Sequence, residues 1–236
     1  MHEISQIRKL SLWIFFTPLL AINLCLLIST NYNFLDNTIF VVDQIGRSNF
    51  TIPYLDGSLS ISRASRTFPQ FLIFKPAMIF TSFFLYFYWS KNNKIINKFN
   101  NTLGKNHNFK IFGILSAIFL SIHSLLLGIE LDIRIFKLLR RVVLLGFIIL
   151  EIIAQGLLVY KFYKLKKKIS YLFNKKILNT KIILVLTLSV VAILSLPILG
   201  GEGNTHFKHA LEWNYFIGVI FFYLLTNFLW KKKETT

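Results

Sequence analysis

The sequence predicts an all-α polytopic membrane protein, built as a six-transmembrane helix bundle in a single domain over residues 1–236. Three observations support this fold class. Six apolar stretches come close to the roughly 20 residues that a helix needs to cross a bilayer core of about 30 Å. Hydrophobic residues make up 54% of the chain, including 25 Phe, which is more than a soluble domain of this size could bury. Lys and Arg also concentrate in alternate loops, as the topology of membrane proteins requires.

The six stretches cover almost the whole chain, so any chemistry must occur in or beside lipid. The first follows Arg8 and Lys9, as in a signal peptide. It is long for such a segment and lacks a small-residue cleavage site, so we expect it to be retained as a span. The predicted spans are residues 12–30, 71–90, 109–129, 142–160, 182–200 and 213–230.

The distribution of charge predicts the orientation of the chain. Eighteen of the 27 Lys and Arg residues lie in the N-terminal tail, the loops 91–110 and 161–181, and the C-terminal tail. Eight lie on the opposite side, where four in the loop 130–141 are partly offset by Glu130 and Asp132. Because positive loops stay in the cytoplasm, both termini of this multi-pass protein are predicted to be cytoplasmic.

The net charge of +17 would also suit a nucleic-acid-binding protein. The basic residues instead lie in short loops at the span ends, where they act as topology signals and contact anionic lipid headgroups. We therefore predict membrane lipids as partners and no nucleic acid. The single cysteine, Cys25, lies inside the first stretch, so no disulfide framework or CxxC motif is present, and we predict no cofactor.

The longest non-cytoplasmic segment is the loop 31–70, which we expect to form an ordered cap over the bundle. Two short strands are predicted in it, at 38–43 and 58–62, with Asp56-Gly57 as a turn between them. Asn49-Phe-Thr51 is a glycosylation sequon on the correct face.

Polar residues within the spans are functional candidates, because charge is costly at membrane depth. Glu151 lies in the middle of the fourth span, with Gln155 one turn later on the same face. We expect Glu151 to point into the bundle, either paired with His123 of the third span or protonated through desolvation. A helix–helix hydrogen bond that only fastens the bundle is the alternative. Glu130 should lie at the outer mouth, and Lys75 should snorkel to the outer headgroups.

The densest polar cluster opens the last span. In a helix, His206, His209 and Glu212 recur at i, i+3 and i+6 and so follow one stripe near the outer surface. Two imidazoles and a carboxylate suit zinc or acid–base catalysis, so these three are the catalytic candidates. The spacing differs from the HExxH motif, capping is the commoner role of such a cluster, and we predict no metal site. Trp213 fits the aromatic belt.

The segment His206-Phe-Lys-His-Ala-Leu-Glu-Trp213 resembles the end of the Frag/DRAM/Sfk family. Ile52-Pro53 followed by a Ser-rich sequence, then Pro69 and an aromatic second span, are similar to that family too. The resemblance implies six spans, a long first outer loop, cytoplasmic termini and a role in lipid handling. At the level of single residues, the resemblance extends to Pro53, His206, Glu212 and Trp213. The chain departs from the family in span three, where His123 stands in place of a carboxylate.

The sequence therefore favours a non-enzymatic lipid-handling or membrane-organising protein. The alternative is an intramembrane lipid hydrolase or acyltransferase that uses the His/Glu cluster with or without zinc. A haem or quinone protein ranks last, since only His123 is predicted at membrane depth, and paired broken helices typical of transporters are missing from the sequence. The predicted headgroup pocket at the outer interface comprises Lys75, His123, Glu130, Glu151, Gln155, His206, Glu212 and Trp213.

Overall fold

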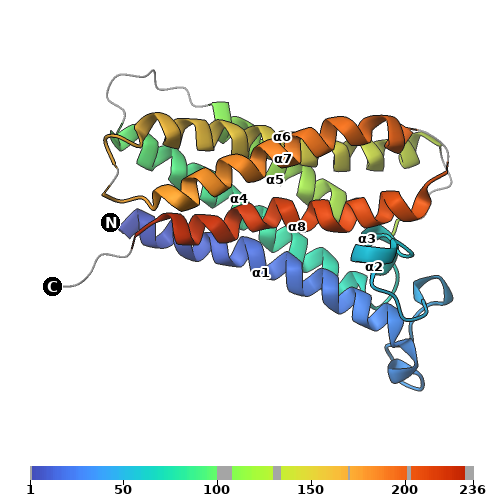
Figure 1. The fold of residues 1–236 in the computed structure, drawn as a ribbon. Coiled ribbons are helices and arrows are strands. Elements are labelled where there is room, and N and C mark those ends of the chain that lie inside the picture. The colour runs from blue at the N-terminus through green and yellow to red at the C-terminus, as the bar shows by residue number, and fades with distance from the viewer. Residues whose placement is uncertain (1, 100–107, 130–133, 170, 201–202, 232–236) are drawn as a thin grey trace.

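The chain folds into a bundle of long helices that run side by side, with a cap of short helices and turns at one end (Figure 1). The computed structural model describes residues 2–99, 108–129, 134–169, 171–200 and 203–231. The long helices are α1 (His2–Thr30), α4 (Phe71–Phe99), α5 (Asn108–Leu126), α6 (Arg134–Leu165), α7 (Lys175–Gly200) and α8 (Thr205–Leu229). The cap contains η1 (Tyr32–Leu35), η2 (Gln44–Gly46), α2 (Pro53–Asp56) and α3 (Ile61–Ser65).

Five of these helices are long and apolar enough to cross a membrane, which makes the chain an integral multi-pass membrane protein. They are His2–Thr30, Phe71–Phe99, Asn108–Leu126, Leu138–Leu165 and Lys175–Ser195. Helix α8 has 25 residues, a length of about 38 Å at 1.5 Å per residue, but it mixes Tyr, Thr, Asn and Trp with its apolar residues. Its buried polar side chains, such as Tyr223 and Thr226, face neighbouring helices.

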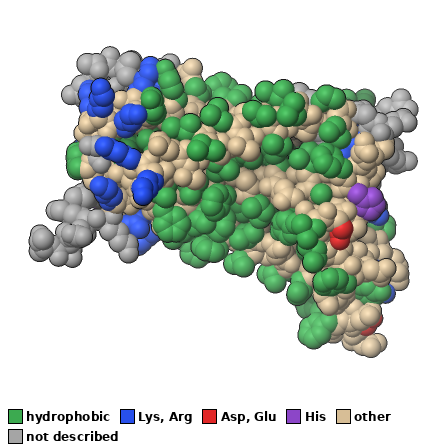
Figure 2. Space-filling view, viewed as in Figure 1, with side chains coloured by type: hydrophobic (Ala, Val, Ile, Leu, Met, Phe, Trp, Pro, Cys, Tyr) green, Lys and Arg blue, Asp and Glu red, His purple; other side chains and the backbone are tan. Residues whose placement is uncertain are grey.

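The bundle presents apolar side chains outward as well as inward. Leu20 and Leu27 of α1 and Leu194 of α7 are each more than half exposed, and Figure 2 shows a broad hydrophobic band around the middle of the molecule. Inside, the helices approach closely at small residues. A Cβ on Gly113 of α5 would overlap the indole ring of Trp89 on α4. An apolar outer surface of this kind is what a lipid environment requires.

Several helices are longer than the apolar stretches that predicted them. Helix α1 begins at His2 instead of residue 12, and α4 continues to Phe99 instead of ending at 90. Apolarity marks where a helix lies in lipid, whereas Lys and Gln are good helix formers that continue the same helix into water. The extensions pack on each other, since Lys91 Nζ donates to Gln6 Oε1 at 2.5 Å.

The two termini and the predicted cytoplasmic loops share one end of the bundle. Arg8 Nε donates to the carbonyl of Asn227 at 3.1 Å, and Phe173, in the loop after α6, forms an antiparallel bridge with Trp230. Lys and Arg side chains gather at this end, while the cap occupies the other (Figure 2).

The predicted orientation leads to a labelling experiment. A cysteine at exposed Asn49, in the cap, should react with a membrane-impermeant reagent from outside intact cells, and a cysteine at exposed Lys167 should react only after permeabilisation. The native Cys25 is fully buried, so the unmodified chain serves as the unlabelled control. Reaction at 167 but not at 49 would reverse the assigned orientation.

The two predicted strands of the cap are wrong: the described part of the cap contains helical turns and irregular backbone. Residues 58–62 alternate in polarity, but Ser60 instead begins a helix, since its Oγ accepts a hydrogen bond from the Arg63 amide at 3.1 Å. The run 38–43 has no neighbouring strand, and its Asp43 amide bonds to the carbonyl of Phe68 at 3.3 Å. A short isolated hairpin is marginal without a third strand, so the cap takes its shape from α1, α4 and α8.

Candidate functional site

The N-terminal end of α8 holds the cap through a row of side chains that bind cap backbone. Trp213 Nε1 donates to the carbonyl of Leu59 at 2.7 Å, and Asn214 Nδ2 donates to the carbonyl of Tyr54 at 2.7 Å. The ring of Tyr54 packs edge-on against Trp213, with centroids 4.8 Å apart. Trp213 is fully buried. An indole with its N–H satisfied and its rings enclosed is a strong anchor, so this contact fixes α2 against α8.

Glu212 lies beside this anchor and caps the helix α3. Its carboxylate accepts hydrogen bonds from the backbone amides of Ile61 and Ser62, the first two residues of α3. Ser60 accepts from the third amide, that of Arg63. The first amides of a helix have no partner within the helix and carry partial positive charge. A carboxylate supplied by α8 therefore stabilises α3 only where α3 sits on α8.

His209 and His206 have different environments although they lie one turn apart. His209 Nδ1 lies 2.9 Å from the carbonyl oxygen of Gly57, while the side chain of His206 is exposed. Gly57 ends α2 with a φ of +60°, and its Cα faces the backbone carbonyl of His206 so closely that any Cβ would overlap it. The stripe predicted from the sequence, formed by His206, His209 and Glu212, lies where the cap contacts α8.

The cap is also closed by a local turn around Asp56. Its carboxylate accepts hydrogen bonds from the amides of Ile52 and Ser58, each at 2.9 Å, and from the hydroxyl of Thr51 at 2.8 Å. These donors, led by the amide of Ser58, lower the pKa of Asp56 from an ordinary 3.8 to about 2. The turn thus depends on the ionised carboxylate.

The turn should therefore survive mild acid. Because the pKa of Asp56 is lower in the folded cap than in the unfolded chain, its contribution to stability is complete above about pH 4 and is lost as the pH falls through about 2. The amide proton shifts of Ile52 and Ser58, followed by NMR in micelles, should titrate with a midpoint near 2. Asp56→Asn should abolish that titration, and a midpoint near 4 would contradict the hydrogen-bonded turn.

The catalytic candidates do not converge on an open site. His209 and Glu212 bind cap backbone, the side chain of His206 is exposed, and no three His, Cys, Asp or Glu side chains among the described residues are grouped to hold a metal ion. The geometry matches the capping alternative for this cluster.

Glu151 joins three helices at the centre of the bundle. Its carboxylate accepts hydrogen bonds from Ser116 of α5 at 2.6 Å, from Gln155 at 3.1 Å, and from the hydroxyl of Tyr223 on α8. Gln155 also donates to the carbonyl of Val219 at 3.3 Å. Glu151 and Gln155 are both fully buried. The predicted inward orientation of Glu151 and its contact with Gln155 are confirmed. Its partners are those expected of a side chain that stabilises the bundle through helix–helix hydrogen bonds.

His123 is not the partner of Glu151, contrary to the sequence-based expectation. Helix α5 ends at Leu126, so His123 lies in its last turn at the outer end. It is seven residues, or about 10 Å along the helix, from Ser116, which does bind Glu151. Its Nδ1 is buried without a hydrogen-bond partner among the described residues. Lys75 directs its ammonium toward the outer end of α4, 5.3 Å from the ring centroid of Phe71. Glu130 lies outside the described residues.

Lys181 is a fully buried lysine that the predicted topology places in the loop 161–181. It is fully buried in α7, donates to Thr226 Oγ1 at 2.5 Å, and lies 3.5 Å from the ring centroid of Phe222. Thr226 also bonds to the hydroxyl of Tyr88 at 3.0 Å. The helical spacing of the buried residues Leu178, Lys181, Val185 and Leu188 is the signal that places Lys181 on the inner face of α7.

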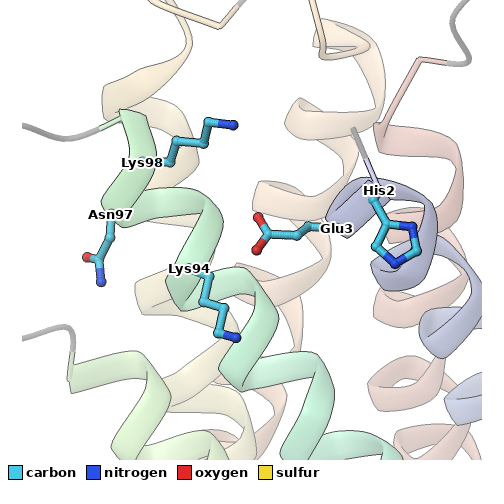
Figure 3. A pocket seen from close by; sticks show the side chains of 5 residues that line it. All are labelled: His2, Glu3, Lys94, Asn97 and Lys98. Atoms are coloured by element: carbon cyan, nitrogen blue, oxygen red, sulfur yellow. The ribbon is translucent and has the colours of Figure 1, made fainter.

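The surface hollow that the structure shows lies at the opposite end of the bundle from the predicted pocket. It has a volume of about 570 Å³ and lies between the start of α1 and the end of α4. Figure 3 shows Glu3 pointing across this space toward α4, which contributes Lys94 and Lys98. Lysines at this end are explained by the topology signal alone, so the hollow adds no candidate site.

Comparison with family models, with curated proteins and with solved structures found no match for this chain. The resemblance to the Frag/DRAM/Sfk family therefore stays a prediction from the short motifs quoted above, and the candidate site is interpreted from its own geometry.

Proposed function

We propose that this chain is a non-enzymatic, six-span membrane protein that handles or organises lipid at the outer interface. The cap of residues 31–70 is the part that meets the lipid headgroups. The observation that supports this proposal most strongly is the attachment of the cap to α8. Glu212, Trp213 and Asn214 of α8 bind cap backbone directly. A protein that fixes a folded cap to the outer ends of its helices presents a defined surface to the headgroup layer.

The sixth span in this proposal is α8. It runs the length of the bundle between α1 and α7 (Figure 1), and its polar residues Tyr223, Thr226 and Asn227 bind neighbouring helices. Polar side chains are tolerated in lipid when they face the bundle. The short motifs shared with the Frag/DRAM/Sfk family support the same topology and the same class of function.

The hydrolase or acyltransferase alternative is less well supported by the geometry. An acid–base pair needs its side chains within reach of a substrate, whereas Glu212 is engaged by Ile61 and Ser62, and His209 by Gly57. Catalysis by these groups would first have to release the cap.

The test is the lipid that accompanies the purified protein. Lipid per chain and the melting temperature are measured in mild detergent for the parent, for His206→Ala, and for the His206→Ala, Glu212→Ala pair. His206→Ala is the matched control, because its exposed side chain lies on the same stripe of α8, six residues before Glu212. Lost lipid in a double variant that stays folded supports a lipid site under the cap. Unchanged lipid with only a lower melting temperature would contradict it.

A further inference from the structure

Residues 34–55 of the cap include large apolar side chains that no part of the described chain covers. Phe34, Ile39, Phe50 and Leu55 are each more than 80% exposed, and Ile45 is 54% exposed. We call these five residues the apolar rim. Single exposed apolar residues are ordinary on a protein surface, but five large ones within one segment of the chain mark an interaction site.

The position of the rim relative to the bundle indicates what it meets. Residues 31–50 leave the outer end of α1 and project sideways at the level of the helix ends (Figure 1). Figure 2 shows hydrophobic side chains on this projection, on the same face of the molecule as those over the helices. The lipid-facing side of α1, with Leu20, Leu24 and Leu27 exposed, leads directly to it. The rim thus continues the membrane-facing surface of the protein.

The rim is held in this position by hydrogen bonds to the bundle. The amide of Ser48 donates to the carbonyl of Ser29, the second-last residue of α1, at 2.8 Å. Arg47 ties the segment together through an ion pair with Asp36 at 3.5 Å and a hydrogen bond from its Nε to the carbonyl of Val42 at 3.1 Å. These contacts hold the segment beside the end of α1, with its apolar side chains at the level of the helix ends.

We propose that the apolar rim inserts into the outer leaflet of the same membrane, at the boundary between headgroups and acyl chains. Residues 31–60 carry three Asp and one Arg, so electrostatic attraction to anionic lipid contributes nothing to this insertion. Burial of apolar side chains drives it, and a zwitterionic bilayer is sufficient. The inference goes beyond the proposed function, because insertion anchors the cap whether or not lipid is organised beneath it.

The experiment places an environment-sensitive fluorophore on single cysteines at positions 34 and 50, with exposed Gln44 as the polar control in the same cap. Cys25 stays in place because it is fully buried, and the unlabelled parent reports its background. In nanodiscs of zwitterionic lipid with one chain per disc, emission from 34 and 50 should shift to shorter wavelength. It should be quenched by spin-labelled lipid more strongly than by an aqueous quencher, with the reverse order at 44.

Equal access of the aqueous quencher to all three positions would overturn the proposal. Protection that appears only with two chains per disc would overturn it as well, because a second copy would then be the occupant. Hydroxyl-radical footprinting of the unmodified chain in the same discs checks that the labels do not create the effect: Phe34 and Phe50 should be oxidised more slowly than in lipid-free detergent. The lipid per chain is measured separately, so failure of insertion and failure of the proposed function remain distinguishable.

Discussion

Replacing Glu151 with Leu should destabilise the bundle by about 2 kcal/mol, whereas Glu151→Gln should change its stability by less than about 1 kcal/mol. The leucine variant removes hydrogen bonds from Ser116, Gln155 and Tyr223, and intramembrane hydrogen bonds are worth about 0.6 kcal/mol each on average. Glutamine keeps one acceptor oxygen for Tyr223 and Gln155, and its amide can donate to the hydroxyl of Ser116, since a hydroxyl can accept as well as donate.

Unfolding free energies in bicelles or mixed micelles provide the measurement. Ile153→Leu is the control on the same helix, because Ile153 is 38% exposed and a volume-conserving exchange there costs little. Loss of a lipid-dependent function in a Glu151→Gln variant of parental stability would show that the carboxylate has a role beyond fastening α5, α6 and α8.

Gly57→Ala should detach the cap while leaving the helix bundle folded. Two physical effects combine at this residue. A φ of +60° is strained for any residue with a Cβ, and the new methyl group would overlap the backbone carbonyl of His206. Because backbone cannot move aside as a flexible side chain can, α2 has to leave α8. We expect rapid proteolysis within residues 31–70 and unchanged helix content by circular dichroism.

Gly203→Ala is the matched control for the overlap. Gly203 also has a positive φ, of +81°, but a Cβ there would meet nothing within 4 Å. Gly203→Ala should therefore lower the free energy of unfolding only by the backbone strain of about 1–2 kcal/mol. The cap should stay protected from proteolysis. Equal protease sensitivity of the two variants would show that the close approach of Gly57 to α8 is unimportant.

The sequence predicts the bundle well because the membrane imposes simple rules. A helix has to satisfy its own backbone in lipid and has to be apolar on its surface, so length and hydropathy are sufficient to locate α1 and α4 to α7. The same rules say little about α8. Its Tyr223 and Thr226 bind other helices, which lowers its apolarity, and the sequence identified it only as the last of six similar stretches.

The site was predicted less completely than the fold, for reasons visible at single residues. Helical spacing correctly places Glu151 with Gln155, and His209 with Glu212. The partners Ser116 and Ser62 come from distant segments, and no local pattern marks them. Short cap segments follow tertiary contacts more than propensity, so the sequence predicts a strand at 58–62, where α3 begins.

Lys181 is a residue for which the sequence-based prediction is wrong. The count of charges by loop treats it as exposed to solvent, whereas its side chain is buried. Counting lysines by loop is a good guide to orientation, but it ignores which face of a helix each lysine occupies. Lys181 lies one residue before the predicted span and is fully buried against Thr226 and Phe222. Its helical spacing with Leu178 and Val185 was the available evidence.

The central claim is that α8 holds a folded cap over the outer ends of the helices, and the direct measurement is amide hydrogen exchange of Ile61 and Ser62 in nanodiscs. In the parent chain both amides should be protected, because each donates to Glu212. Glu212→Ala should expose them while amides within α5 and α6 keep their protection. Unchanged exchange of Ile61 and Ser62 in Glu212→Ala would contradict the claim.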